Sequence, residues 1–323
     1  MSGRGLGQLS IATALVLLAG FGLVFFWVPM DAIEGFRQKI FYLHVPLAIV
    51  ALCGFMAGGV EGFRHLRSND RRHDANSYVF IHISVVFGVA TLITGMIWAK
   101  ASWGHYWVWD EPTLVSFLIV FLLYCTYYPF RYAIEDRDRQ ARYASVFAIT
   151  AGAFVPLNFM AVRMAESLIH PRVFATSQGG LPGSMLFTFL VCLVGVALLW
   201  VTLVKLELLG KQTSGQVSKL RRALEAEGFG KSEPTGTVGR RIAPNLEARE
   251  MSDALPGDAG YVFVAYMVFL ALLLIYLGIL GTKFQRINRD IARLGEEVES
   301  GREREPAGPA GSPESGSREP TSV

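Results

Sequence analysis

Three of the chain's six tryptophans stand within eight residues, in the segment Trp-Gly-His-Tyr-Trp-Val-Trp-Asp from Trp103 to Asp110. Tryptophan and tyrosine favour the headgroup level of a membrane, so such a cluster can belong to an aromatic belt. A belt, however, spreads its aromatic residues over many helix ends. Concentrated in one loop with Gly104, which allows close backbone approach, Trp103, Trp107 and Trp109 suit a platform for a flat apolar ligand.

Two histidines flank this loop. His44 lies in Ile-Phe-Tyr-Leu-His-Val-Pro at the start of the second predicted membrane span, and His170 lies in Ser-Leu-Ile-His-Pro just after the fifth. A lone interfacial histidine is more commonly a hydrogen-bonded or snorkelling side chain. Two at one level beside an aromatic platform can instead supply both axial nitrogens to a haem iron, in a six-coordinate site that disfavours oxygen chemistry.

The other four histidines have simpler interpretations. His65 and His73 stand among arginines in a basic loop, where solvation explains them. His82 lies early in the third predicted span, where an interhelical hydrogen bond is the expected role. His105 lies inside the tryptophan-rich loop and is the substitute ligand if His44 or His170 does not bind iron.

Charged residues near the loop have both structural and ligand-binding interpretations. Asp110 can cap the following helix near Thr113 or contact the ligand. Arg163 and Arg172 bracket the His170 segment and could pair with the propionates of a porphyrin, because a guanidinium offers a planar fork to a carboxylate. Equally, Arg163 could pair only with Glu166.

Composition favours a bilayer as the solvent of the elements that position these residues. Hydrophobic residues make up 52% of the 323 and the mean hydropathy is +0.37. Seven stretches are apolar, almost uncharged and near the ~20 residues that a spanning helix needs. They run over 9–28, 40–60, 77–99, 113–130, 143–164, 185–204 and 261–281. The sequence predicts an all-α membrane protein: a six-helix transmembrane bundle plus a seventh transmembrane helix after a flexible linker.

Lysine and arginine counts in the short loops predict the orientation. Residues 62–76 and 131–142 hold four each, whereas 100–112 and 165–184 hold one each. Loops poor in these residues face outward, so the tryptophan-rich loop, the His170 loop and the loop at 29–39 are expected on the same outer side. The net charge is only +3 and the basic residues lie in membrane-flanking loops, so the sequence does not indicate a nucleic-acid partner.

The chain is expected to have four parts. Residues 1–206 form the six-span unit, and 207–258 mix glycine, serine, proline and charges as a flexible linker. Residues 259–300 form a single-span segment with an amphipathic extension, in which Ile287, Ile291, Leu294 and Val298 recur at helical spacing. Residues 301–323 are rich in Gly, Pro, Ser and Glu and are predicted to be disordered.

Over residues 9–206 the chain resembles the CcmC-type haem-handling membrane proteins of cytochrome c maturation. The resemblance is carried by the order of Ile40–Pro46, the WGxxWxWD loop at 103–110, and Val155–Pro171. It implies haem b as cofactor, axial ligation by His44 and His170, and a loop of Trp103, Gly104, Trp107, Trp109 and Asp110 around the macrocycle. One departure is Glu-Pro-Thr-Leu at 111–114, where relatives usually have a basic residue soon after the aspartate.

Residues 260–299 are similar to CcmD, a small single-span partner in the same system, with an aromatic-rich entry and a basic exit. A natural fusion would fix the two at one-to-one stoichiometry. The resemblance implies transfer of haem at the periplasmic face of a bacterial inner membrane to a membrane-anchored haem chaperone, beside ABC transporter subunits. Six spans leave the linker, and so the start of the seventh span, in the cytoplasm. The basic residues after the seventh span also favour the cytoplasm, although one span must have its two ends on opposite sides of the membrane.

The sequence predicts a haem-handling protein rather than an enzyme, because no nucleophile and base pair or phosphate loop is found. One alternative is a cytochrome c haem lyase-like protein, although such relatives usually carry more spans and a large outer domain. Others are a b-type electron-transfer subunit, which would bury its haem between helices, and a small-molecule transporter without haem.

Overall fold

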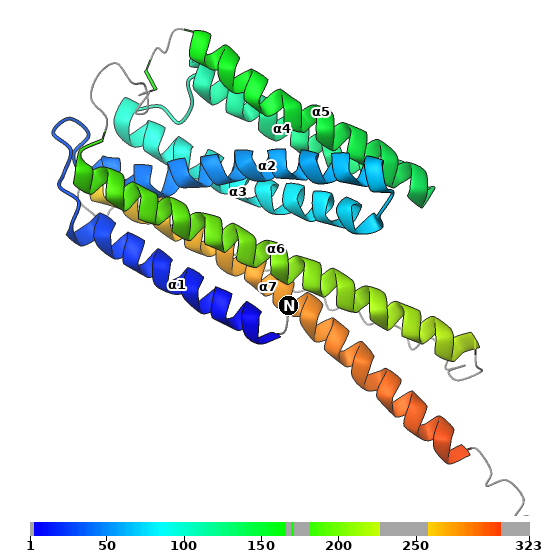
Figure 1. The fold of residues 1–323 in the computed structure, drawn as a ribbon. Helices are drawn as coiled ribbons and strands as arrows, with labels where there is room; N and C mark the ends of the chain where they lie inside the picture. The colour runs from blue at the N-terminus through cyan, green and yellow to red at the C-terminus, as the bar shows by residue number, and fades with distance from the viewer. Residues whose placement is uncertain (1–2, 166–168, 171–180, 227–257, 305–323) are drawn as a thin grey trace, which may run out of the picture. The chain divides into compact units, whose positions relative to one another are not determined.

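In the computed structural model, residues 3–165, 169–170, 181–226 and 258–304 are described, and their regular elements are helices (Figure 1). The elements are α1 (Gly3–Phe26), the 3₁₀-helix η1 (Phe36–Ile40), α2 (Phe41–Ser68), α3 (Arg71–Trp103), α4 (Pro112–Tyr132), α5 (Arg137–Met164), α6 (Gly183–Ala226) and α7 (Asp258–Arg304). Within this part, seven helices are long and apolar enough to cross a membrane. The prediction of an all-α membrane protein with seven spanning helices is confirmed.

The chain divides into two compact units: residues 1–211 with 245–280, and residues 212–244 with 281–323. The first unit contains α1 to α5 together with the first parts of α6 and α7. We call its end with residues 29–39, 100–111 and 169–170 the tryptophan end. The opposite end, where α2 turns into α3 and α4 into α5, is called the basic end.

Acidic side chains begin three of the helices. Asp70, Glu111 and Asp136 precede α3, α4 and α5, and each accepts a hydrogen bond from a backbone N–H of the first turn. Such N-caps satisfy donors that have no partner inside the helix. In α4 the cap is followed by Pro112 at the first helical position, where proline needs no hydrogen bond.

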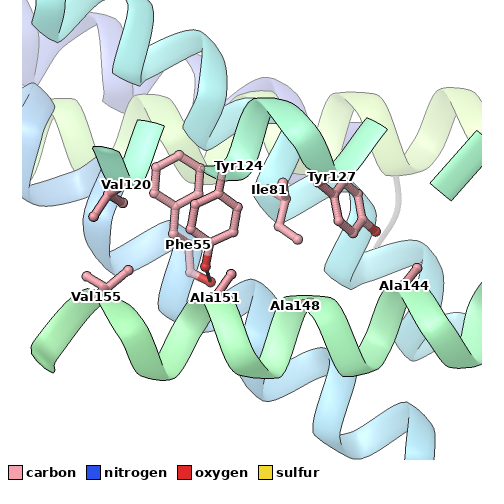
Figure 2. Close-up of a cluster of buried hydrophobic side chains, with 9 residues drawn as sticks. All are labelled: Phe55, Ile81, Val120, Tyr124, Tyr127, Ala144, Ala148, Ala151 and Val155. Carbon is pink, nitrogen blue, oxygen red and sulfur yellow. Dashed lines mark hydrogen bonds between the residues drawn. The ribbon is translucent and has the colours of Figure 1, made fainter. Parts of the chain in front are cut away.

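Helices α2 and α5 pack with their backbones almost in contact. A Cβ added at Gly59 would meet the Ala148 carbonyl oxygen at 2.8 Å, and one at Gly152 would meet the Gly59 Cα at 3.3 Å. Small residues at such a contact let two membrane helices gain close packing where the hydrophobic effect is weak. Around it lies the buried cluster of Figure 2, in which Phe55 stacks on Tyr124 with ring centroids 3.8 Å apart.

Helices α1, α6 and α7 contact one another and the start of α2. Thr13 in α1 and Thr202 in α6 share a 2.9 Å hydrogen bond between hydroxyls. Phe21 in α1 meets the Tyr266 ring of α7 edge-on at 5.1 Å. The Tyr266 hydroxyl also donates to the Lys39 carbonyl in η1 at 3.0 Å, so α7 is attached directly to the turn that leads into α2.

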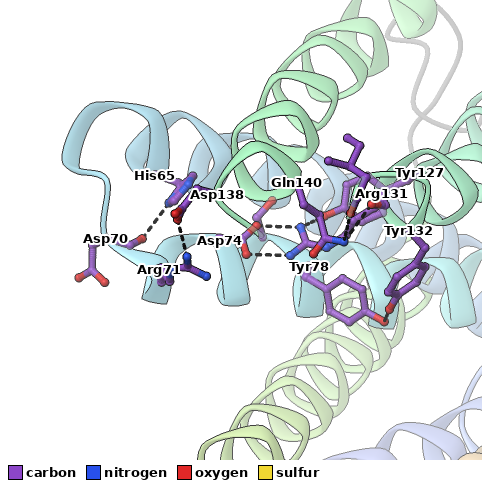
Figure 3. Close-up of polar contacts among 12 residues, drawn as sticks. His65, Asp70, Arg71, Asp74, Tyr78, Tyr127, Arg131, Tyr132, Asp138 and Gln140 are labelled. Atoms are coloured by element: carbon purple, nitrogen blue, oxygen red, sulfur yellow. Dashed lines mark hydrogen bonds and ion pairs between the residues drawn. The ribbon is translucent and has the colours of Figure 1, made fainter. Parts of the chain in front are cut away.

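A polar network closes the basic end (Figure 3). The Arg131 guanidinium donates two 2.7 Å hydrogen bonds to the Asp74 carboxylate and a third to the Tyr127 hydroxyl at 3.0 Å. This fork joins α3 to α4 in the bidentate geometry of strong arginine–carboxylate pairs.

One expectation at the basic end was wrong. His65 is buried rather than solvated, and its Nδ1 lies 2.9 Å from the Asp70 carbonyl oxygen. His73, half-buried, pairs through Nδ1 with the buried Glu61 carboxylate at 2.8 Å. Both imidazoles therefore hold the α2–α3 turn together.

The second unit differs from the expected linker at its start. Helix α6 continues to Ala226, so 207–226 is helical, while 227–257 and the predicted tail from 305 on lie outside the described residues. Of the predicted apolar stripe in α7, Ile287 and Leu294 are buried, whereas Ile291 and Val298 are exposed. The four-part division itself stays a prediction.

Candidate functional site

A cavity of about 340 Å³ opens at the tryptophan end of the first unit. Its wall combines side chains of α2, α3, α4 and α5 with residues of the tryptophan-rich loop and His170, and it is mostly apolar. Ligand pockets of about 300–1,000 Å³ with a few convergent polar groups are typical of small-molecule and cofactor sites.

His44, in the first turn of α2, contributes an imidazole to this wall. Its Nδ1 lies 3.1 Å from the Thr91 carbonyl oxygen and 3.2 Å from the Thr94 hydroxyl, both in α3. The Thr94 hydroxyl already donates to the Ala90 carbonyl at 2.8 Å. Because a carbonyl can only accept, we assign the proton to Nδ1, which leaves the Nε2 lone pair available to a metal.

Gly95 makes room for that ring. A Cβ at residue 95 would lie 2.7 Å from the His44 Cε1, well inside van der Waals contact. On the same helix, Trp98 meets the imidazole edge-on, with ring centroids 5.8 Å apart. One face of α3, carrying Thr91, Thr94, Gly95 and Trp98, thus forms the seat of His44.

His170 reaches the same cavity from the segment after α5. The fully buried Glu111 carboxylate accepts the backbone N–H groups of Ile169 at 2.9 Å and of His170 at 3.2 Å. It also accepts the Thr113 N–H at 3.3 Å and so caps α4. Of the two interpretations of Asp110, capping of α4 was wrong, because the N-cap is Glu111, one residue later.

The charge of Glu111 suits this role. Burial alone would raise the pKa of the Glu111 carboxyl, but hydrogen bonds from the N–H groups of Ile169, His170 and Thr113 lower the pKa below its ordinary value. The group is therefore ionised at neutral pH and acts as a fixed acceptor for the backbone that carries His170.

The tryptophan-rich loop contributes two of its three indoles to the cavity. Trp103, the last residue of α3, lies edge-on to His170 at a centroid distance of 6.2 Å. Trp107 also lines the cavity, and its buried Nε1 has no acceptor within the described ranges. A ligand that brings an acceptor, such as a carboxylate, would satisfy this donor.

Tyr106 of the same loop also lines the cavity, whereas Trp109 and Asp110 lie outside its wall. Trp109 is 71% exposed, and its ring packs against that of Trp107 at a centroid distance of 5.8 Å. Asp110 and His105 are exposed, and Gly104 ends α3 in the left-handed conformation with a φ of 77°. The structure thus brings four predicted site residues together at the cavity: His44, His170, Trp103 and Trp107.

The remaining candidates are distributed as follows. Arg163 lines the cavity, with its guanidinium 5.1 Å from the centre of the Phe159 ring. Arg172, the other candidate for a propionate, and Glu166, the alternative partner of Arg163, lie outside the described residues. His82 lies 3.0 Å through Nδ1 from the Tyr128 hydroxyl, which confirms the expected hydrogen bond between α3 and α4.

Sequence reasoning missed Glu111 and the His44 seat. The signal for Glu111 was present, since an acid directly before a proline is typical of a helix start. The signal for the seat is Thr91, Thr94 and Gly95 at i, i+3 and i+4, which share one helix face. That spacing alone does not say which partner the face meets.

Comparison with known proteins identifies the family. The family model CcmC, heme exporter protein C, matches residues 1–222. Proteins named heme exporter protein C are 36% identical over 172 residues in Rhodobacter capsulatus (52% of this chain, 69% of the relative) and 31% over 198 in Bradyrhizobium diazoefficiens (60% and 74%). In Paracoccus denitrificans the identity is 35% over 153 residues (46% and 62%).

The family match ends before α7, so the CcmD-like character of that segment stays a prediction. For the residues before α7, the family model covers 222 of the 323 residues, and the named relatives are more than 30% identical. Both comparisons point to the same family, and the family model falls on the six-helix unit. The chain belongs to the heme exporter protein C family.

Proposed function

We propose that this protein binds haem b at the tryptophan end of the membrane and hands it on during c-type cytochrome biogenesis. Its family is a membrane component of a haem transport and delivery system, and not an enzyme family. The protein is then a carrier whose site must both hold and release its cargo.

Axial ligation by His44 and His170 is the central part of the proposal. The observation that carries it is that the two imidazoles, one on α2 and one after α5, line a single apolar cavity. The bond from the His44 Nδ1 to the Thr91 carbonyl leaves Nε2 as the donor, as in other metal-binding histidines oriented by a backbone acceptor. Two neutral nitrogen donors would produce a six-coordinate, low-spin iron.

The loop from Trp103 to Asp110 is proposed to bind the macrocycle. Trp103 and Trp107 would contact the flat apolar face, while Gly104, Trp109 and Asp110 form the exposed part of the same loop. Arg163, on the cavity wall, is suited to a propionate, and the unpartnered Nε1 of Trp107 is suited to an acceptor of the same kind.

Location and partners follow from the orientation and the family. We place the site on the periplasmic side of the bacterial inner membrane, since the loops at the tryptophan end are poor in lysine and arginine. The exposed Trp109 and Asp110 are then accessible to a membrane-anchored haem chaperone. ABC transporter subunits of the cytochrome c maturation system are the other proposed partners.

The test is a visible absorption spectrum of the purified protein after haem loading. The unaltered protein should show low-spin haem. His44→Ala and His170→Ala should each convert it towards a five-coordinate, high-spin spectrum or lose haem, and added imidazole should partly restore the low-spin form.

Two matched controls separate ligation from general damage. His105→Ala removes an exposed imidazole of the same loop, and His73→Ala removes one at the basic end. Both should leave the spectrum unchanged. Low-spin haem that survives both single changes at residues 44 and 170 would refute the assignment.

A further inference from the structure

The directions of α6 and α7 in the first unit are fixed by contacts at its two ends. At the tryptophan end, Phe189 near the start of α6 packs on Phe41 with ring centroids 5.2 Å apart. Also there, Asp258, the first residue of α7, pairs with Arg37 at 3.8 Å. Both helices therefore begin at the tryptophan end.

Later residues of both helices reach the basic end. The Lys211 ammonium of α6 lies 4.0 Å from the centre of the Tyr78 ring, near the start of α3. Tyr276 of α7 lies 6.2 Å, centroid to centroid, from His82. Chain number thus increases in the same direction along both helices, so α6 and α7 are parallel.

A continuous chain would have to return across the membrane between them. Length is no obstacle, since the 31 residues between the end of α6 at Ala226 and the start of α7 at Asp258 could span more than the ~30 Å of the hydrocarbon core. Composition is the obstacle. The longest run without a charged side chain between the two helices is six residues, 234–239, whereas a spanning helix needs about 20.

Inverting α7 in a continuous chain would remove the conflict but lose its observed contacts. The Arg37–Asp258 pair and the hydrogen bond from Tyr266 to the Lys39 carbonyl both require the start of α7 at the tryptophan end. Ile40 is also buried against Val262 and Ala265. Inversion would further place the basic residues after the span on the side where such residues are disfavoured.

We infer that the α7 seated in this structure belongs to a separate single-span polypeptide, held non-covalently by α1 and η1 with its N-terminus at the tryptophan end. The six-helix part and this helix then form a two-polypeptide assembly encoded by one sequence. Two origins give the same short product: translation that starts at Met251, or hydrolysis of one peptide bond by a protease, in which water adds to leave a carboxylate and an amine. The inference does not depend on haem binding.

Tags at both ends of the full chain test it. Membranes that express the chain should contain a short polypeptide that carries the C-terminal tag and copurifies in mild detergent with one that carries the N-terminal tag. Met251→Ala should remove the short product if it arises by initiation and leave it if it arises by hydrolysis. A C-terminal tag found only on the full-length chain would overturn the inference.

Crosslinking tests the direction of α7 independently. In a background without Cys53, Cys125 and Cys192, a short bis-maleimide should join the two tagged products when Arg37→Cys is combined with Asp258→Cys. The matched control combines Arg37→Cys with Gly278→Cys, which lies two residues beyond Tyr276 at the basic end. Joining of the control pair instead would show an inverted helix and overturn the inference.

Discussion

Glu111 and Thr91 illustrate how much of the proposed site depends on groups that position the two imidazoles without being iron ligands themselves. The Glu111 carboxylate holds the backbone of Ile169 and His170, and the Thr91 carbonyl sets the proton of His44. The two imidazoles are thus positioned by hydrogen bonds from α4 and α3 respectively. A ligand set held in this way loses little conformational freedom on binding.

We predict that Glu111→Ala lowers the low-spin haem fraction although no ligand is removed. The change leaves the N–H groups of Ile169 and His170 without their buried acceptor, at about 1–3 kcal/mol for each unsatisfied group. Glu111→Gln keeps one oxygen acceptor and should give an intermediate loss. Absorption spectra at equal membrane abundance measure both; an unchanged spectrum for the alanine variant would contradict the role.

The pH dependence of stability supplies a second readout for Glu111. Because its pKa is lowered in the folded protein, the stabilisation is fully present above the ordinary value of 4.5 and is lost as pH falls below it towards the lowered pKa. The difference in melting temperature between the unaltered protein and Glu111→Gln should therefore be constant from pH 5 to 8 and shrink below about 4.5.

At the scale of elements, the tryptophan-rich loop is only half inside the cavity. Its composition predicts an aromatic platform but cannot say which indole faces inward. That choice depends on the left-handed turn at Gly104 and on the helix start at Glu111, which together set the path between them. Trp107 lines the cavity, whereas Trp109 is outside its wall and packs against the Trp107 ring.

We predict that Trp107→Ala weakens haem retention much more than Trp109→Ala does. A tryptophan that loses about half of its 150–250 Å² of contact forfeits on the order of 2–3 kcal/mol, or roughly 100-fold in affinity. Trp109, 71% exposed, has less contact to lose. Haem titration of the two variants compares them directly, and equal losses would argue against the difference in position.

The helices themselves were predictable from apolar length, and their ends less so. Five of the seven predicted spans lie inside observed α-helices. The first, 9–28, runs two residues past the end of α1 at Phe26, and the second, 40–60, begins in η1, one residue before α2. The prediction ended the sixth at 204, because the apolar run stops there, yet α6 continues to Ala226. A helix can leave the bilayer as a polar helix, so loss of hydropathy marks the edge of the membrane and not the end of the helix.

At the scale of the whole molecule, the distribution of lysine and arginine along the sequence matches the two ends seen in the structure, the basic end and the tryptophan end. Loops rich in lysine and arginine lie together at the basic end, whereas the loop 100–112, with a single lysine and no arginine, contributes to the cavity wall. The sequence could predict this alternation because it depends on counts. The sequence could not predict the direction of α7, since a single apolar span can cross the membrane in either orientation. Only contacts such as the Arg37–Asp258 ion pair distinguish the two orientations.

We predict that the two ends differ in access to an impermeant thiol reagent. In a background without native cysteines, the exposed His105→Cys should be labelled on intact cells, because the positive-inside preference orients the tryptophan end outward. Ser68→Cys, exposed at the basic end, should be labelled only after permeabilisation. The reverse pattern would place the site on the cytoplasmic side.

The Glu111 carboxylate couples the opening of the first turn of α4 to the movement of the segment that carries His170. It caps the first turn of α4 and also holds the segment that carries His170, so opening either one disturbs the other. A molecule that immobilises His170 therefore slows amide hydrogen exchange at the start of α4, and release of that molecule restores it. The first turn of α4 becomes a reporter of whether the carrier is loaded, which a docking partner could sense without touching the cargo.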